Sequence, residues 1–455
     1  MKVHFIAIGG SVMHHLAIAL KKKGYEVTGS DDDIFEPSRS KLAAYDLLPT
    51  QFGWFPEKIH VQLDAVILGM HAKADNPELQ KARQLGLKVY NFPEYIFELS
   101  KSKQRVVIAG SHGKTTVTSM VVHVLQYWQK KIDFLVGATT AEREETVRLT
   151  EEAPVILLEG DEYPSSPLDK RPKFLHYHQH IGVVTGIAWD HINAYPIYED
   201  YLKQFTLFLE ASCKAGTLIY CEEDETLKAL VEKADMPHDV NLIPYKTHAH
   251  EIDRGLTYLI SNNGKKVPVN FFGKHNLMNV SAAFEVALKQ GVNKEEFYEA
   301  IASFKGASKR LELIKENKIT KVFRDFAHAP SKLKATVDAV KSQFPQSKVV
   351  ACMELHTFSS LNPEFIAHYK DSMRSADEAL VYINPNTVAK KGFKQIDESA
   401  LRFAFNNPGL RFYDNEKKLY DDLSAKTWNN SILLLMSSGN FNNMDIDALT
   451  QHIVL

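Results

Sequence analysis

The stretch Val106-Val107-Ile108-Ala109-Gly110-Ser111-His112-Gly113-Lys114-Thr115-Thr116 decides the fold around it. It begins with an apolar, mostly β-branched run typical of a buried strand, and its glycines mark a tight turn. After the turn, apolar residues recur at helical spacing, at Met120, Val121, Val124 and Leu125. We therefore expect a strand, a short loop and a helix whose N-terminal backbone N–H groups face an anion.

The side chains of this loop favour a nucleotide as the anion. Lys114 would place a positive charge on the phosphates, and Thr115 would offer its hydroxyl to Mg2+. The loop is shorter than the usual phosphate loop, because Ile108 stands where that pattern has its first glycine and Gly110 comes later. A plain turn between a strand and a helix is the alternative, but the position of Gly-Lys-Thr favours an ATP site.

Polar residues follow two later apolar runs. Residues 154–158 lead into Glu159-Gly160-Asp161-Glu162, and residues 182–187 lead towards Trp189-Asp190-His191. The carboxyl ends of parallel strands share one edge of a sheet, so Glu159 and His191 are expected near the phosphate loop, where the Mg2+ of a nucleotide is held. An acidic loop that caps the next helix would explain each motif separately, but not both together.

The N-terminal block has a glycine turn of its own. Residues 3–8 are predicted to form a strand, followed by Gly9-Gly10-Ser11 and a helix through Leu20. A dinucleotide fingerprint is incomplete here, because Ala7 and Met13 replace its first and third glycines, so a nucleotide diphosphate other than NAD is favoured. An NAD-dependent oxidoreductase would also leave the phosphate loop and its carboxylates unused.

The last block, from Leu313, again alternates strands with helices. Strands are predicted at 321–326, 348–353, 378–383 and 431–436, with a helix over 331–343. This alternation predicts a parallel sheet. We thus expect an α/β protein with three domains: an N-terminal Rossmann-like domain over 1–101, a central P-loop ATPase domain with a mostly parallel sheet over 102–312, and a C-terminal Rossmann-like domain over 313–455.

Composition excludes several classes of partner. The chain has 455 residues and a net charge of −2, so no overall basic field points to nucleic acid or an anionic membrane. No apolar run approaches the roughly 20 residues that a membrane span needs. The 3 cysteines show no paired spacing, which favours a reducing, cytoplasmic location over a disulfide or zinc framework.

A separate histidine pattern lies in residues 176–180. His176, His178 and His180 alternate and would share one face of a strand, as metal ligands can. No acidic or cysteine residue adjoins them, so a surface or substrate contact is favoured over a metal site.

Taken in order, these motifs resemble the Mur ligases, a family that builds the peptidoglycan precursor by ATP-dependent amide formation. The resemblance covers essentially the whole chain, and the short phosphate loop is the form that this family uses. The motifs that carry it are Gly110–Thr116, Glu159–Glu162, Asp190-His191, Gly273-Lys274-His275-Asn276 with Asn279, Lys309-Arg310, and Asp325–Pro330.

The resemblance implies an ADP-forming ligase. A substrate carboxylate would take the γ-phosphate of ATP, and an amine would then attack the acyl-phosphate. The residues implied to bind ATP are Gly110, Ser111, His112, Gly113, Lys114, Thr115, Thr116, His275, Asn279, Arg310 and Asp325. Those implied to hold Mg2+ are Thr115, Glu159 and His191. Those implied in catalysis are Lys114, His191, Arg310 and His328, and those implied to bind UDP-N-acetylmuramate are Gly9, Gly10, Ser11, Ser30 and Asp31.

Residues 169–177, Asp-Lys-Arg-Pro-Lys-Phe-Leu-His-Tyr, are similar to a segment of the murein peptide ligases within this family. That likeness implies L-Ala-γ-D-Glu-meso-diaminopimelate as the amine substrate, in peptidoglycan recycling. The alternative is ligation of L-alanine in peptidoglycan synthesis. Glu354-Leu355-His356 departs from the Glu-Pro-Arg of the murein peptide ligases. The sequence does not decide whether the third residue of the peptide is diaminopimelate or lysine. It also does not decide whether the protein is a monomer or a homodimer.

Overall fold

The computed structural model describes residues 1–70, 72–140 and 143–454. The chain forms two compact units: one holds residues 1–139, 143–187 and 199–245, and the other holds residues 188–198 and the chain from Lys246 onward. Three of the sheets are mostly parallel, as the sequence predicts, and the fold class is confirmed.

The first sheet is four-stranded, in the order β2-β1-β3-β4, and all of its pairs are parallel. Its strands are β1 (Lys2–Ile6), β2 (Glu26–Ser30), β3 (Ala65–Leu68) and β4 (Val89–Asn91). Its helices are α1 (Met13–Lys22), α2 (Ser38–Ala43), α3 (Pro77–Gln84) and α4 (Phe92–Leu99). The helix after the glycine turn begins at Met13, so residues 9–12 remain a turn at the end of β1.

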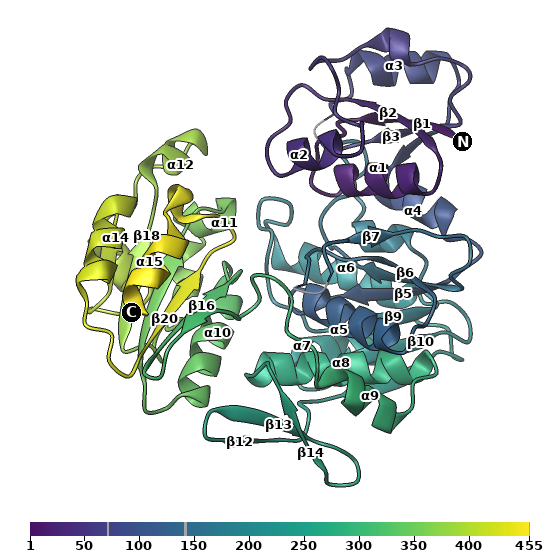
Figure 1. Ribbon diagram of the computed structural model, residues 1–455. Coiled ribbons are helices and arrows are strands. Elements are labelled where there is room, and N and C mark those ends of the chain that lie inside the picture. The colour runs from purple at the N-terminus through teal and green to yellow at the C-terminus, as the bar shows by residue number, and fades with distance from the viewer. Residues whose placement is uncertain (71, 141–142, 455) are drawn as a thin grey trace. The chain divides into compact units, whose positions relative to one another are not determined.

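The second sheet has seven strands, in the order β11-β10-β9-β5-β8-β6-β7, and only β7 is antiparallel to its neighbour. The strands are β5 (Gln104–Ala109), β6 (Ile132–Leu135), β7 (Val147–Arg148), β8 (Val155–Glu159), β9 (Ile181–Val184), β10 (Thr217–Cys221) and β11 (Asn241–Tyr245). The helices are α5 (Lys114–Tyr127), α6 (Tyr198–Glu210) and α7 (Glu225–Lys233), with a short 3-10 helix at Lys173–His176. β5 lies between β8 and β9, so the loop after β5 opens at the centre of the sheet edge (Figure 1).

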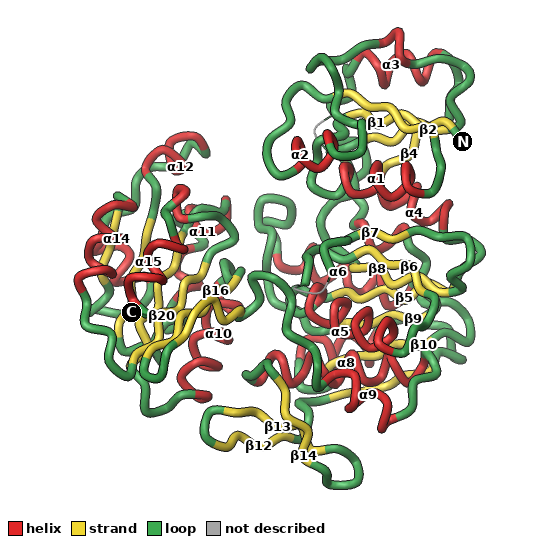
Figure 2. The backbone as a smooth tube through the Cα atoms, viewed as in Figure 1, coloured by secondary structure: helices red, strands yellow, loops and turns green. Residues whose placement is uncertain are grey.

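The second unit contains an antiparallel three-stranded sheet, two helices and a six-stranded sheet in the order β15-β16-β20-β17-β18-β19. Figure 2 shows the strands of both sheets in yellow. The first part comprises β12 (His250–Asp253), β13 (Leu256–Ile260), β14 (Lys266–Val269), α8 (Lys274–Lys289) and α9 (Lys294–Ile301). The strands of the second part are β15 (Glu312–Glu316), β16 (Thr320–Asp325), β17 (Lys348–Glu354), β18 (Glu378–Tyr382), β19 (Arg411–Tyr413) and β20 (Ser431–Met436). Its helices are α10 (Pro330–Gln343), α11 (Phe358–Leu361), α12 (Pro385–Lys390), α13 (Glu398–Ala404), α14 (Glu416–Ala425) and α15 (Ile446–Ile453).

The six-stranded sheet is buried on both faces. Val349, Ala351 and Met353 of β17 belong to one apolar core, while Val350 and Cys352 belong to the other. Successive side chains of a strand point to opposite faces, so this division means that helices cover both sides. The unbroken apolar runs in the sequence arise from this double burial.

Candidate nucleotide site

The loop after β5 has the predicted form of strand, tight turn and helix. Gly110 has φ +127° and Gly113, the residue before α5, has φ +78°. A Cβ at Gly110 would lie 2.2 Å from the Thr185 hydroxyl oxygen, so neither backbone shape nor space admits a larger residue there. The loop thereby packs directly against the end of β9 and leaves the first turn of α5 at the edge of the sheet.

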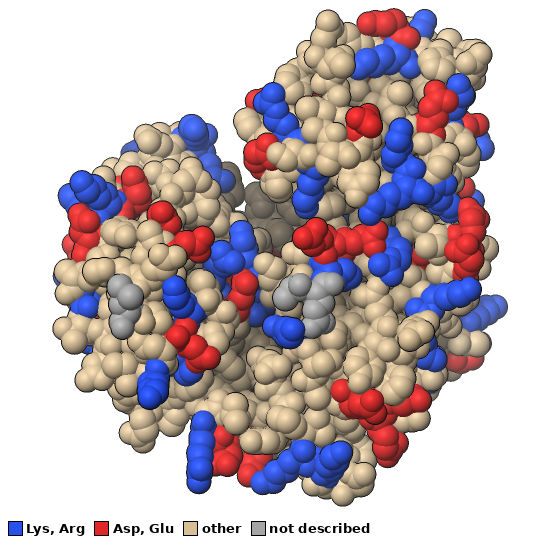
Figure 3. All heavy atoms as spheres, viewed as in Figure 1, with Lys and Arg blue, Asp and Glu red and all other residues tan. Residues whose placement is uncertain are grey.

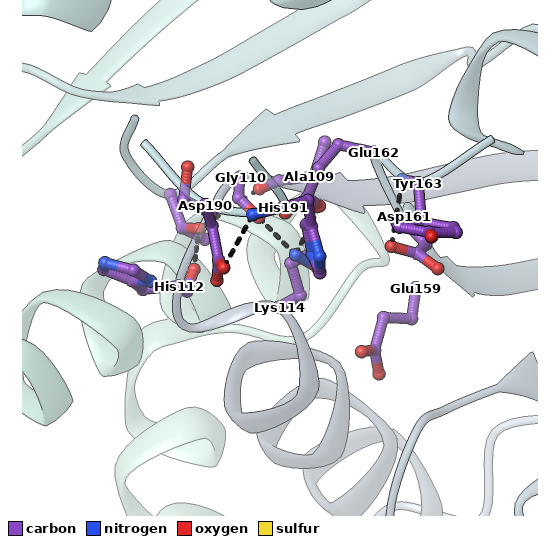
Figure 4. A network of polar contacts seen from close by, with 12 residues as sticks. Ala109, Gly110, His112, Lys114, Glu159, Asp161, Glu162, Tyr163, Asp190 and His191 are labelled. Atoms are coloured by element: carbon purple, nitrogen blue, oxygen red, sulfur yellow. Dashed lines mark hydrogen bonds and ion pairs between the residues drawn. The ribbon is translucent and has the colours of Figure 1, made fainter. Parts of the chain in front are cut away.

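Lys114 lies in the first turn of α5 and is held by the loop and by a carboxylate (Figure 4). Its Nζ donates to the Gly110 carbonyl at 2.6 Å and to Glu162 Oε2 at 2.6 Å. Burial by itself lowers the pKa of Lys114, but the nearby carboxylates of Glu162 and Asp161 outweigh it and raise the pKa above its usual value. The lysine is therefore a fixed positive charge beside the helix N-terminus.

Thr115 and Glu159 form a second contact at the same edge. The Thr115 hydroxyl donates to Glu159 Oε1 at 2.8 Å, and the Gly137 N–H donates to Glu159 Oε2 at 2.6 Å. Glu159 ends β8, the neighbour of β5, which explains how residues so far apart in sequence meet. A hydroxyl and a carboxylate together are oxygen ligands of the kind that Mg2+ prefers.

The loop also has a partner that sequence reasoning missed, Tyr201 of α6. Its fully buried phenol oxygen lies 2.7 Å from Ser111 Oγ and donates to Glu162 Oε1 at 3.4 Å. Tyr201 thus joins the loop to the carboxylate that holds Lys114. A tyrosine on the apolar face of a helix is not part of any sequence motif, so the sequence could not predict this contact.

The other predicted loop residues lie on the same turn. The His112 carbonyl accepts a hydrogen bond from the Thr185 hydroxyl, and Thr116 is buried in the first turn of α5.

The residues predicted to bind the diphosphate lie at the adjoining ends of β1 and β2. The Gly9 N–H donates to Asp31 Oδ2 at 2.7 Å, and Lys58 Nζ donates to Ser30 Oγ at 3.2 Å. Gly10 follows in the turn, and Ser11 is exposed. Burial raises the pKa of Asp31 to about 6, although the Gly9 N–H lowers it.

In the second unit, a buried carboxylate organises the segment after β9. Asp190 Oδ1 accepts from the His191 N–H at 2.8 Å, and its Oδ2 accepts from Lys332 Nζ at 2.9 Å. Burial raises the pKa of Asp190, but the positive charge of Lys332 outweighs it and holds this pKa well below its usual value. Trp189 packs edge-on to Phe365, so the segment lies against the apolar core on one face of the C-terminal sheet.

His328 lies near the same carboxylate, with its Nε2 4.0 Å from Asp190 Oδ2. Its Nδ1 donates to the Phe326 carbonyl at 2.9 Å. Burial, together with Lys332, lowers the pKa of His328 to about 3, so its ring is neutral at physiological pH.

Arg310 and Asp325 lie close to each other. The guanidinium carbon of Arg310 is 4.5 Å from the centre of the Phe326 ring. Asp325 accepts from the Leu311 N–H at 2.8 Å and from the Thr336 hydroxyl at 2.6 Å, so its carboxylate joins the residue after Arg310 to α10.

His275 and Asn279 lie on α8, one turn apart as predicted. The Asn279 side-chain NH2 donates to Asn276 Oδ1 at 3.4 Å. Burial lowers the pKa of His275, against the nearby Asp325, so its ring is neutral.

A further polar group lies where β17 and β20 end. Glu354 Oε2 accepts from the Ser437 hydroxyl and from the Phe441 N–H, and Ser438 Oγ lies 3.3 Å from His356 Nε2. A Cβ at Gly439 would lie 2.8 Å from Glu354 Oε2, which explains the glycine. Parallel sheets bind ligands beyond such strand ends.

Comparison with known proteins identifies the family. The model of the Mur ligase family, catalytic domain, matches residues 2–104, and the Mur ligase middle domain matches residues 108–287. The UDP-N-acetylmuramate–L-alanine ligase of Arthrobacter sp. (strain FB24) is 32% identical over 84% of this chain and 80% of its own length. The chain belongs to the Mur ligase family. It is therefore an ATP-dependent acid–amino-acid ligase.

Solved Mur ligase structures share the fold. A murein peptide ligase from Psychrobacter arcticus 273-4 aligns over 100% of this chain and 99% of its own, with a TM-score of 0.66 and 22% identity. The UDP-N-acetylmuramate–alanine ligase of Thermotoga maritima aligns over 100% and 98%, with a TM-score of 0.71 and 21% identity. The three-domain α/β fold predicted from the sequence is that of these Mur ligases.

Basic and acidic side chains are interspersed over the face in Figure 3, without a field of one sign. Among the described residues, no helix has both the length and the apolar character needed to cross a bilayer.

Proposed function

We propose that this Mur ligase joins the lactyl carboxylate of UDP-N-acetylmuramate to the amine of L-alanine, in the cytoplasm, as a step of peptidoglycan synthesis. The observation that carries the proposal is the 32% identity to a UDP-N-acetylmuramate–L-alanine ligase over 84% of the chain. The phosphate loop and the Gly9–Ser11 turn supply sites of the right chemistry for ATP and for a nucleotide diphosphate.

A second candidate for the amine is the tripeptide L-Ala-γ-D-Glu-meso-diaminopimelate, which the sequence pattern of residues 169–177 favours. In the structure this segment is engaged in contacts of its own: Lys173 Nζ bonds Asp161 Oδ2 at 2.5 Å, and Arg171 bonds Asp169. These contacts give the segment a structural explanation that requires no peptide substrate. We therefore rank L-alanine first.

We assign the roles in ATP chemistry residue by residue. Lys114 would bind the β- and γ-phosphates, since it is a fixed cation at the N-terminus of α5. Ser111, His112, Gly113 and Thr116 would add loop contacts. Arg310 and His328 would act on the acyl-phosphate, and His275, Asn279 and Asp325 would contact or support the nucleotide.

Mg2+ fits the donors at the sheet edge. Thr115 and Glu159 already meet through a hydroxyl and a carboxylate oxygen, and His191 would complete the proposed ligand set. The ion would offset the charge that develops on the transferring phosphoryl group.

A mass-spectrometric ligation assay tests the proposal. It combines UDP-N-acetylmuramate and Mg-ATP with either L-alanine or the tripeptide, and UDP-N-acetylglucosamine replaces the muramate as a control that lacks the carboxylate. Product with L-alanine alone supports the proposal, and product with the tripeptide alone supports the second candidate. The absence of product with both amines would contradict the muramate assignment.

His356→Ala sharpens the same assay. The side chain lies at the ends of β17 and β20, where we expect the amine to bind, so the KM for the amine should rise at least about tenfold while the KM for ATP stays the same. Equal changes in both constants would contradict an amine site at this edge.

A further inference from the structure

Three potential metal ligands meet in the first unit, away from the phosphate loop's own contacts. Glu94, Asp169 and His176 each offer one ligand atom, and these atoms lie within 4.8 Å of one another. The His176 side chain is only 5% exposed. Its Nε2 is buried without a hydrogen-bond partner, although it lies 3.3 Å from Asp169 Oδ2.

Local structure fixes the direction of each side chain. Glu94 forms a capping box with Asn91 at the start of α4, in which its Oε2 accepts the Asn91 N–H at 2.9 Å. Its other oxygen, Oε1, lies 4.0 Å from His176 Nδ1. Asp169 is set by a turn in which its N–H donates to Ser166 Oγ at 3.0 Å. The cluster is therefore built by a helix cap and a turn rather than by free surface side chains.

The predicted row of histidines is not formed. His176 lies in a 3-10 helix and His178 has φ +46°, so the alternation does not belong to a strand. The His178 ring packs on Phe97 with centroids 4.8 Å apart, and His180 Nδ1 accepts the Arg105 N–H at 3.0 Å. Only His176 meets carboxylates, and these come from positions that the spacing in the sequence does not connect.

Arg171 balances the charge of the two carboxylates. Its Nη2 lies 2.6 Å from Asp169 Oδ2 and 3.6 Å from Glu94 Oε1. The side chain is 63% exposed, so it can turn into solvent without breaking a core. A cation at the cluster would replace this guanidinium as the partner of the carboxylates.

We propose that Glu94, Asp169 and His176 form a binding site for a divalent transition-metal ion of the Zn2+ class, for which Arg171 competes. One imidazole and two carboxylates are a ligand set that suits Zn2+ better than Mg2+, which prefers oxygen alone. The bound ion would tie α4 to residues 169–176, and this site is independent of the amine substrate.

Isothermal titration of the metal-stripped full-length protein with ZnCl2 tests the site. His176→Asn and Glu94→Gln should each weaken Zn2+ binding at least about tenfold, because each removes one ligand. His178→Asn is the matched control and should bind Zn2+ as the wild type does. Zn2+ bound to carboxylates elsewhere appears equally in all variants and cancels in the comparison.

Arg171→Gln provides the opposite signal. Removal of the competing guanidinium should tighten Zn2+ binding several-fold, and circular dichroism checks that the variant is folded, because an unfolded chain also binds Zn2+ through its histidines and cysteines. Equal Zn2+ affinity in the wild type and His176→Asn, with native circular dichroism, would overturn the metal site. Unchanged affinity in Arg171→Gln would overturn the competition.

Discussion

Two buried carboxylates each hold a lysine, Glu162 in the first unit and Asp190 in the second. Lys114 lies 2.6 Å from Glu162, 48 residues away in the chain, and Lys332 lies 2.9 Å from Asp190, 142 residues away. The chemistry of the pairs is similar, but Lys114 begins α5 directly after the phosphate loop, whereas Lys332 lies on α10, far along the chain from Asp190. Sequence analysis singled out Lys114 and gave Lys332 no role.

The difference indicates that the two lysines have different roles, one in binding phosphate and one in stabilising the fold. Lys114 stands at a helix N-terminus, where a bound phosphate can take the place of its carboxylate partner. The Lys332–Asp190 pair attaches residues 188–198 to α10, and Ile192 enters the apolar core between α10 and the C-terminal sheet. We thus expect loss of Lys114 to lower the rate of ligation, and loss of Lys332 to lower the free energy of unfolding.

The largest effect is expected for Lys114→Ala. Loss of this cation should lower kcat for ligation about 1000-fold, because the charge on the transferring phosphoryl group is no longer offset. The measurement is steady-state ligation, with circular dichroism as the control for folding. Turnover within tenfold of the wild type would remove Lys114 from phosphate binding.

Lys332→Met should instead destabilise the protein. Asp190 is only 6% exposed and would be left as a buried, less well compensated charge, at a cost of about 3 kcal/mol. Urea unfolding measures the loss. Lys334→Met is the matched control, because the Lys334–Asp338 pair is exposed and should contribute less than about 1 kcal/mol. Equal free energies of unfolding in both variants would mean that the Lys332–Asp190 pair does not stabilise the fold.

Tyr201→Phe tests the missed link between the phosphate loop and Glu162. Loss of the phenol hydroxyl should cost about 1 kcal/mol of ATP binding, a rise of about fivefold in the KM for ATP, because Ser111 and Glu162 are less firmly placed. Tyr220→Phe on β10 is the control. A KM equal to that of the control would show that Tyr201 only fills the core.

The smallest effect is expected from Asp31, as a change of stability with pH. Its pKa is about 6 in the folded state against 3.8 for the ordinary side chain, so its ionisation opposes folding. The stability present below pH 3.8 is lost as the pH rises through about 6. Asp31→Asn cannot ionise at this position. The melting temperature of this variant, relative to that of the wild type, should therefore rise between about pH 4 and pH 8. Parallel curves would contradict the raised pKa.

Local sequence is sufficient where one element carries the chemistry. The run from Val106 to Thr116 contains a strand, its turn and a helix start, so the loop could be predicted without a partner. The same holds for Gly9 to Ser11, because the ends of β1 and β2 are adjacent in register, with Ile6 opposite Ser30. The roles assigned to these residues stay predictions.

Contacts between different helices and strands could not be predicted from the local sequence. Tyr201 meets Ser111 only after α6 packs on the sheet, and His176 meets Glu94 only because α4 lies beside residues 169–176. The histidine alternation was misleading, since a period of two has meaning only in a strand, and His176 lies in a 3-10 helix.

The sequence by itself determined the α/β class with mostly parallel sheets, the strand–turn–helix form of residues 106–116 and the likeness to Mur ligases, because periodicity and glycine turns are encoded by neighbouring residues. Tertiary structure alone decided which carboxylate the two buried lysine contacts use: Glu162 for Lys114 and Asp190 for Lys332. Charge pairing depends on distance in space, and that distance is set only when strands, helices and their connecting turns have packed.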